Sequence, residues 1–309
     1  MLAHSLVAVL VLALLADVVI NTLRPGRAMR QIEAKGRIWF YRRFVLGGWL
    51  LAVFALLPVV ESDDLTLTDL GLTLSGGGVA GRVLPGVVVI AWGLTAFVLA
   101  VFVRSGRQTR EHVLAGGSTP ARDRSAPMYP RTPRERRLAL AVAVTAGVTE
   151  EVVHRGLLIA AGVVLFDLPI VVAALISIAL FAGMHLYQGA QGVYGAAMLG
   201  LIFTGVTALS GSLLPAMIIH VTIDVIALLL VPPSDGAAQG DPVQPTAAQP
   251  DPAQTATAIG NHAPKDETAG AGQGPAGAPT AHRVTIPVVP GPPPPAATLP
   301  TLRRSAPHG

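Results

Sequence analysis

Apolar segments of near-constant length alternate with short polar segments through the first three quarters of the chain. They lie at about 2–23, 44–60, 84–103, 138–160, 168–186, 193–210 and 213–231. A helix needs about 17–25 apolar residues to cross a bilayer. The pattern therefore predicts an all-α, polytopic transmembrane bundle with about seven spans. The first span has neither a positive n-region nor a small-residue cleavage site, so we interpret it as a retained helix rather than a signal peptide.

Lysine and arginine are distributed unevenly over the connections. Segment 24–43 holds seven basic residues and one acid, segment 61–83 holds four acids and one arginine, and segment 104–137 holds nine arginines and three acids. Cytoplasmic connections carry the excess of basic residues. We therefore expect the first and third connections, and the C-terminus, on the cytoplasmic side of the plasma membrane, with the N-terminus outside. The aromatic run 39–41 is predicted to anchor the chain at the interface.

The last part of the chain, 232–309, has a different composition. It carries 17 of the 26 prolines, mixed with Ala, Gln, Thr and Gly. Such a segment cannot bury enough apolar surface to fold alone, and we predict a disordered cytoplasmic tail with polyproline II character. A variable linker is favoured over a docking site for a Pro-rich-tail partner. The expected domains are thus N-terminal helices with basic loops (1–131), a catalytic core (132–231) and the tail.

The overall composition agrees with a membrane protein. Hydrophobic residues make up 51% of the chain and charged residues only 13%, whereas soluble domains carry about 25% charged residues. Cysteine is absent, which excludes disulfides and thiolate metal sites. The net charge of +4 comes from residues clustered in two connections. It therefore gives no reason to expect a nucleic-acid partner.

One apolar span contains four ionisable side chains, in the stretch "VTEEVVHRG" at 148–156. A charge at the centre of a membrane helix costs about 2.5–3.5 kcal/mol on insertion scales, so such residues usually face a protein interior. Glu151 and Arg155 are i,i+4 on a helix and can pair. Glu150 lies about 100° further round and is left to point into a cavity. His154 is expected to pack at a helix interface.

Two later spans add further polar residues. "FAGMH" places Phe181 and His185 on one helix face, and "HVTID" places His220 and Asp224 on one face of the last span. Asp224 is expected to orient or charge-balance His220, as carboxylates often do for working imidazoles. Three helices thus supply a spare glutamate, two histidines and an aspartate.

These three motifs, in this order, resemble those of the CPBP (CAAX-protease and bacteriocin-processing, or Abi) family of intramembrane proteases. The matching stretches are "EEVVHRG", "FAGMH" and "HVTID", and the resemblance covers about 133–231. It implies a helical membrane bundle with a polar cavity that opens toward the cytosol, and cleavage of a peptide bond. Relatives commonly have eight spans, and segments 61–83 and 104–137 could each hold a surface helix.

The resemblance also implies roles for individual residues. Glu150 would be the general base that activates water, while His185 and His220 would hold water or metal and stabilise the oxyanion. Asp224 stands where the family often has Asn. The supporting residues would be Glu151, Arg155 and Phe181. The chain departs from the family at His154, where relatives usually carry an apolar or aromatic residue.

Amide hydrolysis needs a base for water, a stabiliser for the oxyanion and a proton for the leaving amine. His185, His220 and one carboxylate, either Glu150 or Asp224, would make a three-ligand site with an open position for zinc or another divalent metal. The sequence does not choose between metal-bound water and glutamate-activated water. The resemblance to enzymes commonly called metalloproteases favours the metal.

Three functions are compatible with these observations. We favour an intramembrane endopeptidase that acts on a peptide or protein in or at the lipid bilayer. The second interpretation is a catalytically idle scaffold, for example of the bacteriocin-immunity type, that binds a peptide or partner. The third is a proton-coupled transporter, although no inverted repeat or pair of broken helices is evident.

Overall fold

The computed structural model describes residues 1–73, 84–118 and 120–232, and throughout this part of the chain the regular structure is helical. These residues belong to the first of two compact units, Met1–Gln244. The all-α prediction is confirmed for them. The tail predicted at 232–309 lies outside the described residues, except for its first position.

Each of the seven predicted apolar spans coincides with a helix. The helices are α1 (Leu2–Leu23), α2 (Arg27–Lys35), α3 (Arg37–Val60), α4 (Pro85–Leu114), α5 (Pro120–Arg124), α6 (Pro133–Glu151), α7 (Ile159–Val164), α8 (Ile170–Met184), α9 (Ala190–Ser210) and α10 (Leu214–Val225). Short 3-10 helices lie at Ala126–Met128 (η1) and Leu186–Gln188 (η3), and π-helices at Val152–Leu158 (η2) and Ile226–Leu230 (η4). In the described residues, α1, α3, α4 and α9 are long and apolar enough to cross a membrane, while α8 and α10–η4 are shorter apolar helices.

Both basic connections contain helices, as the sequence allowed for segment 104–137 but not for segment 24–43. Segment 24–43 contains α2, whose Met29 and Ile32 are buried, and glycines with positive φ at 26 and 36 separate it from α1 and α3. The aromatic run 39–41, which was expected at the membrane interface, lies on the first turns of α3. The ammonium of Lys35, the last residue of α2, lies 4.6 Å from the centroid of the Trp39 ring. Segment 104–137 likewise contains the end of α4, α5, η1 and the start of α6.

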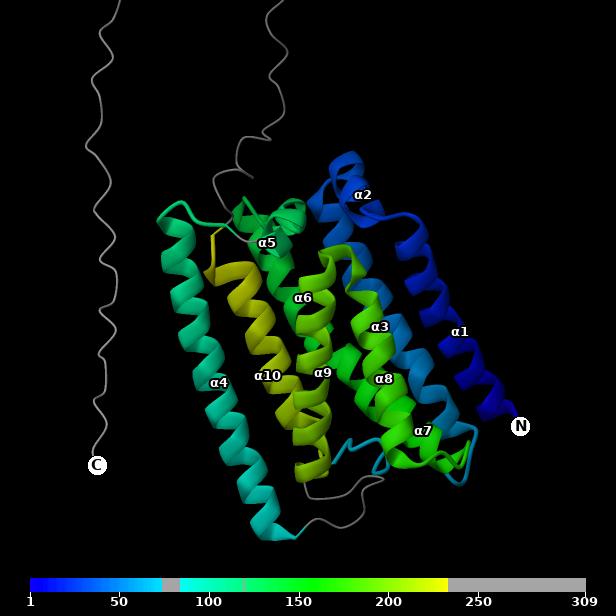
Figure 1. Ribbon diagram of the computed structural model, residues 1–309. Helices are drawn as coiled ribbons and strands as arrows, with labels where there is room; N and C mark the ends of the chain where they lie inside the picture. Colours follow the sequence, from blue (N-terminus) through cyan, green and yellow to red (C-terminus); the bar gives the residue numbers. More distant parts are fainter. Residues whose placement is uncertain (74–83, 119, 233–309) are drawn as a thin grey trace, which may run out of the picture. The chain divides into compact units, whose positions relative to one another are not determined.

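The two basic connections lie at the same end of this unit. Figure 1 shows α2 and α5 at one end, while the chain leaves α3 at the opposite end. This arrangement agrees with the prediction that the first and third connections lie on the same side of the membrane. η1 is tied to α3, because the Tyr41 hydroxyl donates to the Met128 carbonyl at 2.5 Å and Arg37 Nε donates to the Pro127 carbonyl at 2.9 Å.

Helix α6 lies at the centre of the packing, with extensive contacts to α3 and α10. It begins with a capping box, in which the Thr132 hydroxyl accepts from the Glu135 N–H and the Glu135 carboxylate accepts from the Thr132 N–H. Small residues permit its close approach to both neighbours. A Cβ added to Gly147 would lie 2.6 Å from the backbone nitrogen of Val221 on α10. α6 and α10 are therefore packed almost backbone to backbone at this level.

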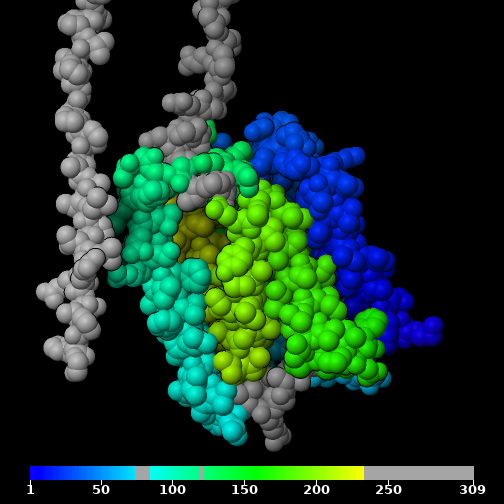
Figure 2. Space-filling view, viewed as in Figure 1, coloured from blue at the N-terminus to red at the C-terminus, as the bar shows by residue number. Residues whose placement is uncertain are grey.

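The remaining helices enclose this centre. One apolar cluster joins α1, α3, η2, α7 and α8, and a second joins α4, α8, α9 and α10. Figure 2 shows α10 set back between α4 and α9. Large apolar side chains such as Val89, Phe97 and Leu175 are exposed on the outer surface. A surface of this kind suits contact with acyl chains, which require no polar groups.

Candidate active site

The predicted catalytic glutamates lie where helix α6 changes its hydrogen-bonding pattern. Glu150 and Glu151 form its last turn, and the chain continues as the π-helix η2, all seven residues of which are buried. π-Helical segments are rare, and those inside α-helices occur frequently at functional sites. The apolar span predicted at 138–160 lies within one helical segment, which runs from Pro133 to Val164 and changes from α to π and back to α.

The predicted pair between Glu151 and Arg155 is confirmed. Arg155 Nη1 donates to Glu151 Oε1 at 3.1 Å, and both side chains are fully buried. The guanidinium carbon also lies 4.1 Å from the ring centroid of Phe181. Removal of water strengthens both the ionic and the cation–π interaction, so the pair compensates part of the cost of burying two charges.

The carboxylate that contacts His220 directly is Glu151. His220 Nδ1 lies 2.7 Å from Glu151 Oε1, whereas Asp224 Oδ2 lies 3.9 Å from the other ring nitrogen, Nε2. Of the two roles expected of Asp224, direct orientation of His220 falls instead to Glu151 on another helix, while charge balance is compatible with the distance of 3.9 Å. The cause is the close approach of α6 and α10 at Gly147, which brings the end of α6 opposite His220.

Glu150 occupies a different environment from its neighbour. Its side chain is 20% exposed, and its Oε2 lies 3.9 Å from His220 Nε2, which is longer than a hydrogen bond. It lines a cavity of about 150 Å³ together with His185, His220 and Asp224. The four residues that the sequence singled out, carried by three helical segments, thus share one cavity.

His185 lies at the C-terminal end of α8, as the residue that caps the helix. Its Nδ1 lies 2.8 Å from the carbonyl oxygen of Phe181, which can only accept a hydrogen bond. Nδ1 therefore carries the hydrogen, and in the neutral ring Nε2 is left as an acceptor. The tautomer of His185 is thus set by the turn that ends the helix.

Two phenylalanines hold the imidazoles in place. Phe181 lies edge-on to His154 and His220, with ring centroids 5.4 and 6.0 Å apart, and at 4.9 Å from His185. Phe203, on α9, stacks on His220 at 5.0 Å and is fully buried. The spacing "FAGMH" pointed to Phe181. Nothing in the sequence distinguished Phe203 from other apolar residues of its span.

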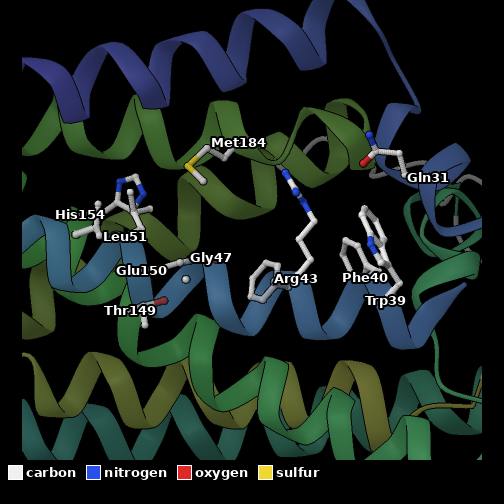
Figure 3. Close-up of a pocket in the computed structure, with 13 residues that line it drawn as sticks. Gln31, Trp39, Phe40, Arg43, Gly47, Leu51, Thr149, Glu150, His154 and Met184 are labelled. Carbon is white, nitrogen blue, oxygen red and sulfur yellow. The ribbon is translucent and has the colours of Figure 1, made fainter. Parts of the chain in front are cut away.

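A second cleft, of about 240 Å³, leads to Glu150 from another side (Figure 3). It lies between α3 and the junction of α6 with η2. In Figure 3, His154, Leu51 and Glu150 lie toward one end of the cleft and Trp39 and Gln31 toward the other, with Arg43 between the two groups. A third, wider cavity of about 350 Å³ reaches Glu150 and His185 from the side of α1 and α2.

The side chains expected to ligate a metal do not form a metal site in this structure. In the part of the chain that the structure describes, no three His, Cys, Asp or Glu side chains are grouped so that they could hold a metal ion. His220 uses Nδ1 for Glu151, and its Nε2 lies 3.9 Å from both remaining carboxylates. The residues as placed do not fit a zinc site, and the metal stays a prediction.

Comparison with known proteins gives the class of this site. Residues 134–226 match the model of a protease family of CAAX type, described as type II CAAX prenyl endopeptidase Rce1-like. This segment spans nearly all of α6 to α10, and the match agrees with the resemblance of the three motifs to the CPBP family. A search of curated proteins and a search of solved structures gave no match.

Proposed function

We propose that this chain is an intramembrane endopeptidase that hydrolyses a peptide bond of a membrane-associated protein or peptide. One observation carries the proposal. A carboxylate, two imidazoles and a second carboxylate, brought together from three helical segments, line one small cavity within a bundle of apolar helices. Buried ionisable residues in apolar helices are costly and usually functional, and the family match of residues 134–226 agrees with hydrolysis.

Glu150 is the base in this proposal. The Glu150 carboxylate lies 3.9 Å from His220 Nε2, whereas Glu151 contacts Arg155 and His220 at 3.1 and 2.7 Å. Because Glu150 also lines the cavity, it can accept a proton from water there. His185 assists, because the hydrogen on its Nδ1 is used by the Phe181 carbonyl and Nε2 can accept the other hydrogen of the water. The water is thereby oriented by two acceptors.

His220 stabilises the charge that develops on the carbonyl oxygen. Its Nδ1 donates to Glu151, which Arg155 holds in turn, so the imidazole is fixed in position, and in this proposal the ring carries a hydrogen on both nitrogens. Its Nε2 hydrogen then points away from Glu151 and is available to an oxyanion. This arrangement of carboxylate, imidazole and reacting group follows the logic of catalytic triads.

The reaction balances with these groups alone. The water oxygen forms a bond to the carbonyl carbon while its proton passes to Glu150, and the oxyanion is held by His220. When the C–N bond breaks, the leaving nitrogen takes a proton from Glu150, and the carboxylate is regenerated. Asp224 Oδ2, 3.9 Å from His220 Nε2, balances the charge of the doubly protonated imidazole.

The proposed location is the plasma membrane, with the cavity near the cytoplasmic face. The cavity is lined in part by Ser125, Met128 and Tyr129, which come from the connection between α4 and α6. This connection shares one end of the unit with α2 and carries many arginines (Figure 1). Basic connections face the cytoplasm, so the substrate would reach the cavity from the bilayer near that surface.

The test compares Glu150→Gln with wild type in nanodiscs, using a mixture of lipid-anchored synthetic peptides and mass spectrometry of the products. Glu111→Gln on α4 is the matched control, because it removes an exposed carboxylate that does not line the cavity. We expect cleavage by wild type and Glu111→Gln and none by Glu150→Gln. Peptide binding without cleavage in all three proteins would favour a scaffold, and proton flux coupled to a solute would favour a transporter.

A further inference from the structure

Tyr187 is a polar residue of the site that the proposed reaction does not use. It lies in η3, two residues after the end of the "FAGMH" motif, and lines the cavity of about 150 Å³ that the four ionisable side chains share. It also lines the wider cavity that reaches Glu150 and His185 from the side of α1 and α2. Tyr187 therefore borders two approaches to the proposed base.

The η3 turn holds the Tyr187 ring in place. The Gln188 N–H donates to the His185 carbonyl at 2.9 Å, and Gly189, with a φ of 78°, ends the turn before α9 begins. The Tyr187 ring stacks on the His185 ring, with centroids 6.1 Å apart and planes inclined by 27°. The phenol is thus held beside the imidazole that is proposed to orient the water.

The Tyr187 hydroxyl has a hydrogen to donate. Gln188 Nε2 lies 2.8 Å from Tyr187 Oη, and because an amide nitrogen only donates, the phenol oxygen accepts this bond. No group among the described residues accepts the hydrogen of the Tyr187 hydroxyl. This hydrogen is therefore available to a molecule that enters the cavity.

The phenol acts as a neutral donor. Burial raises the pKa of the Tyr187 phenol above its ordinary value, against a smaller lowering by the hydrogen bond from Gln188. The charges of Glu150 and Asp224, which line the same cavity, raise this pKa further. The phenol oxygen thus lies within electrostatic reach of both carboxylates, and it keeps its hydrogen near neutral pH.

The proposed reaction leaves a place for a second donor. The oxyanion receives one hydrogen bond, from His220 Nε2, whereas oxyanion sites combine several donors aimed at one oxygen. Glu150 and Asp224 are acceptors as carboxylates, and neutral His185 gives its only hydrogen to the Phe181 carbonyl. None of these three side chains supplies the second donor.

Tyr187 is the best placed of the hydroxyl groups that line this cavity. The other two, of Ser125 and Tyr129, belong to the connection between α4 and α6, and the Tyr129 hydroxyl accepts from Arg122 at 3.3 Å. Of the three, only Tyr187 also lines the wider cavity that reaches Glu150.

We infer that Tyr187 is a catalytic residue, whose hydroxyl donates a hydrogen bond to the oxygen of the scissile carbonyl and stabilises the oxyanion together with His220. The inference rests on the proposed function. The phenol hydrogen stays on Tyr187 throughout, so the proton transfers of the proposed reaction are unchanged. The bond strengthens as negative charge develops on the carbonyl oxygen, so it raises kcat more than it tightens substrate binding.

The experiment measures kcat and KM for a lipid-anchored peptide in nanodiscs. Tyr187→Phe removes the hydroxyl and keeps the ring that stacks on His185. Loss of one oxyanion donor typically costs about 10²- to 10³-fold in kcat, so we expect kcat to fall about 10²-fold while KM changes little. Tyr194→Phe is the matched control, because it removes an exposed phenol on α9 that lines neither cavity, and its kcat should equal that of wild type.

A second measurement links the hydroxyl to the carbonyl oxygen. The same peptide is made with sulfur in place of the scissile carbonyl oxygen, because sulfur is a weak hydrogen-bond acceptor. The ratio of kcat for the oxygen peptide to kcat for the sulfur peptide should be about tenfold smaller in Tyr187→Phe than in wild type, since the variant has lost one bond to that atom. A purely structural role of Tyr187 would leave this ratio unchanged.

Thermal unfolding of each variant separates loss of fold from loss of the donor. A wild-type kcat in Tyr187→Phe, or an unchanged ratio, would overturn this inference, and cleavage that still depends on Glu150 would leave the proposed function standing. Absence of any Glu150-dependent cleavage by wild type would overturn both.

Discussion

The close approach of α6 and α10 at Gly147 makes a prediction that links packing to catalysis. In Gly147→Ala, the new Cβ would lie 2.6 Å from the Val221 backbone nitrogen and 2.4 Å from its Cγ2. The Val221 side chain can rotate, but the backbone nitrogen cannot. An ordinary contact needs 3.4 Å or more, so the two helices must separate by about 0.8 Å at this level.

This displacement is large enough to break the contact on which the histidine depends. His220 Nδ1 and Glu151 Oε1 are 2.7 Å apart, and a shift of about 0.8 Å takes them to the limit of a hydrogen bond. Overpacking of this kind costs about 1–3 kcal/mol, and loss of an orienting carboxylate typically costs about 10- to 100-fold in activity. We therefore expect Gly147→Ala to lower both Tm and kcat/KM.

The assay is peptide cleavage in nanodiscs together with thermal unfolding of the same preparations. Gly205→Ala on α9 is the matched control, because a Cβ there meets no atom within 4 Å and both Tm and kcat/KM should stay near wild type. If Gly147→Ala cleaves at the wild-type rate with an unchanged Tm, the α6–α10 contact does not position His220, and this reasoning is refuted.

Three further predictions concern the charges of the site. Arg155→Ala leaves Glu151 buried without its cation and should destabilise the protein by about 3–5 kcal/mol, measured by thermal unfolding; an inactive variant as stable as wild type would show that Arg155 acts in chemistry instead. Glu151→Gln should lower kcat/KM more than Asp224→Asn, because only Glu151 bonds His220 directly; the reverse order would assign the orienting role to Asp224. Exhaustive dialysis against a chelator, followed by metal analysis and assay, should leave kcat/KM unchanged, because the described donors do not assemble a metal site; recovery of activity only with zinc would contradict this.

Local features of the site could be predicted from the sequence because they depend on helical spacing. The Glu151–Arg155 pair follows from the i,i+4 relation, and the common face of Phe181 and His185 from the same rule. The apolar spans likewise marked the long helices of the bundle, and a surface helix was allowed for in segment 104–137, where α5 lies, but α2 was missed within a segment that looked like a basic loop.

Contacts between helices could not be predicted in the same way. The bond between Glu151 and His220 depends on how closely α6 and α10 approach, and Gly147 sets that distance only in combination with Val221. Phe203 stacks on His220 from a span with no polar marker. The π-helix η2 changes which side chains face inward, and a period of 3.6 residues does not reveal it.

The central claim is that Glu150 activates the water that cleaves the peptide bond. The most direct measurement is single-turnover cleavage in H2¹⁸O by wild type and Glu150→Gln in nanodiscs, with mass spectrometry of the new carboxyl terminus. We expect one ¹⁸O atom in the wild-type product and a rate at least about 10²-fold lower in a folded Glu150→Gln. Cleavage by Glu150→Gln at the wild-type rate would contradict it.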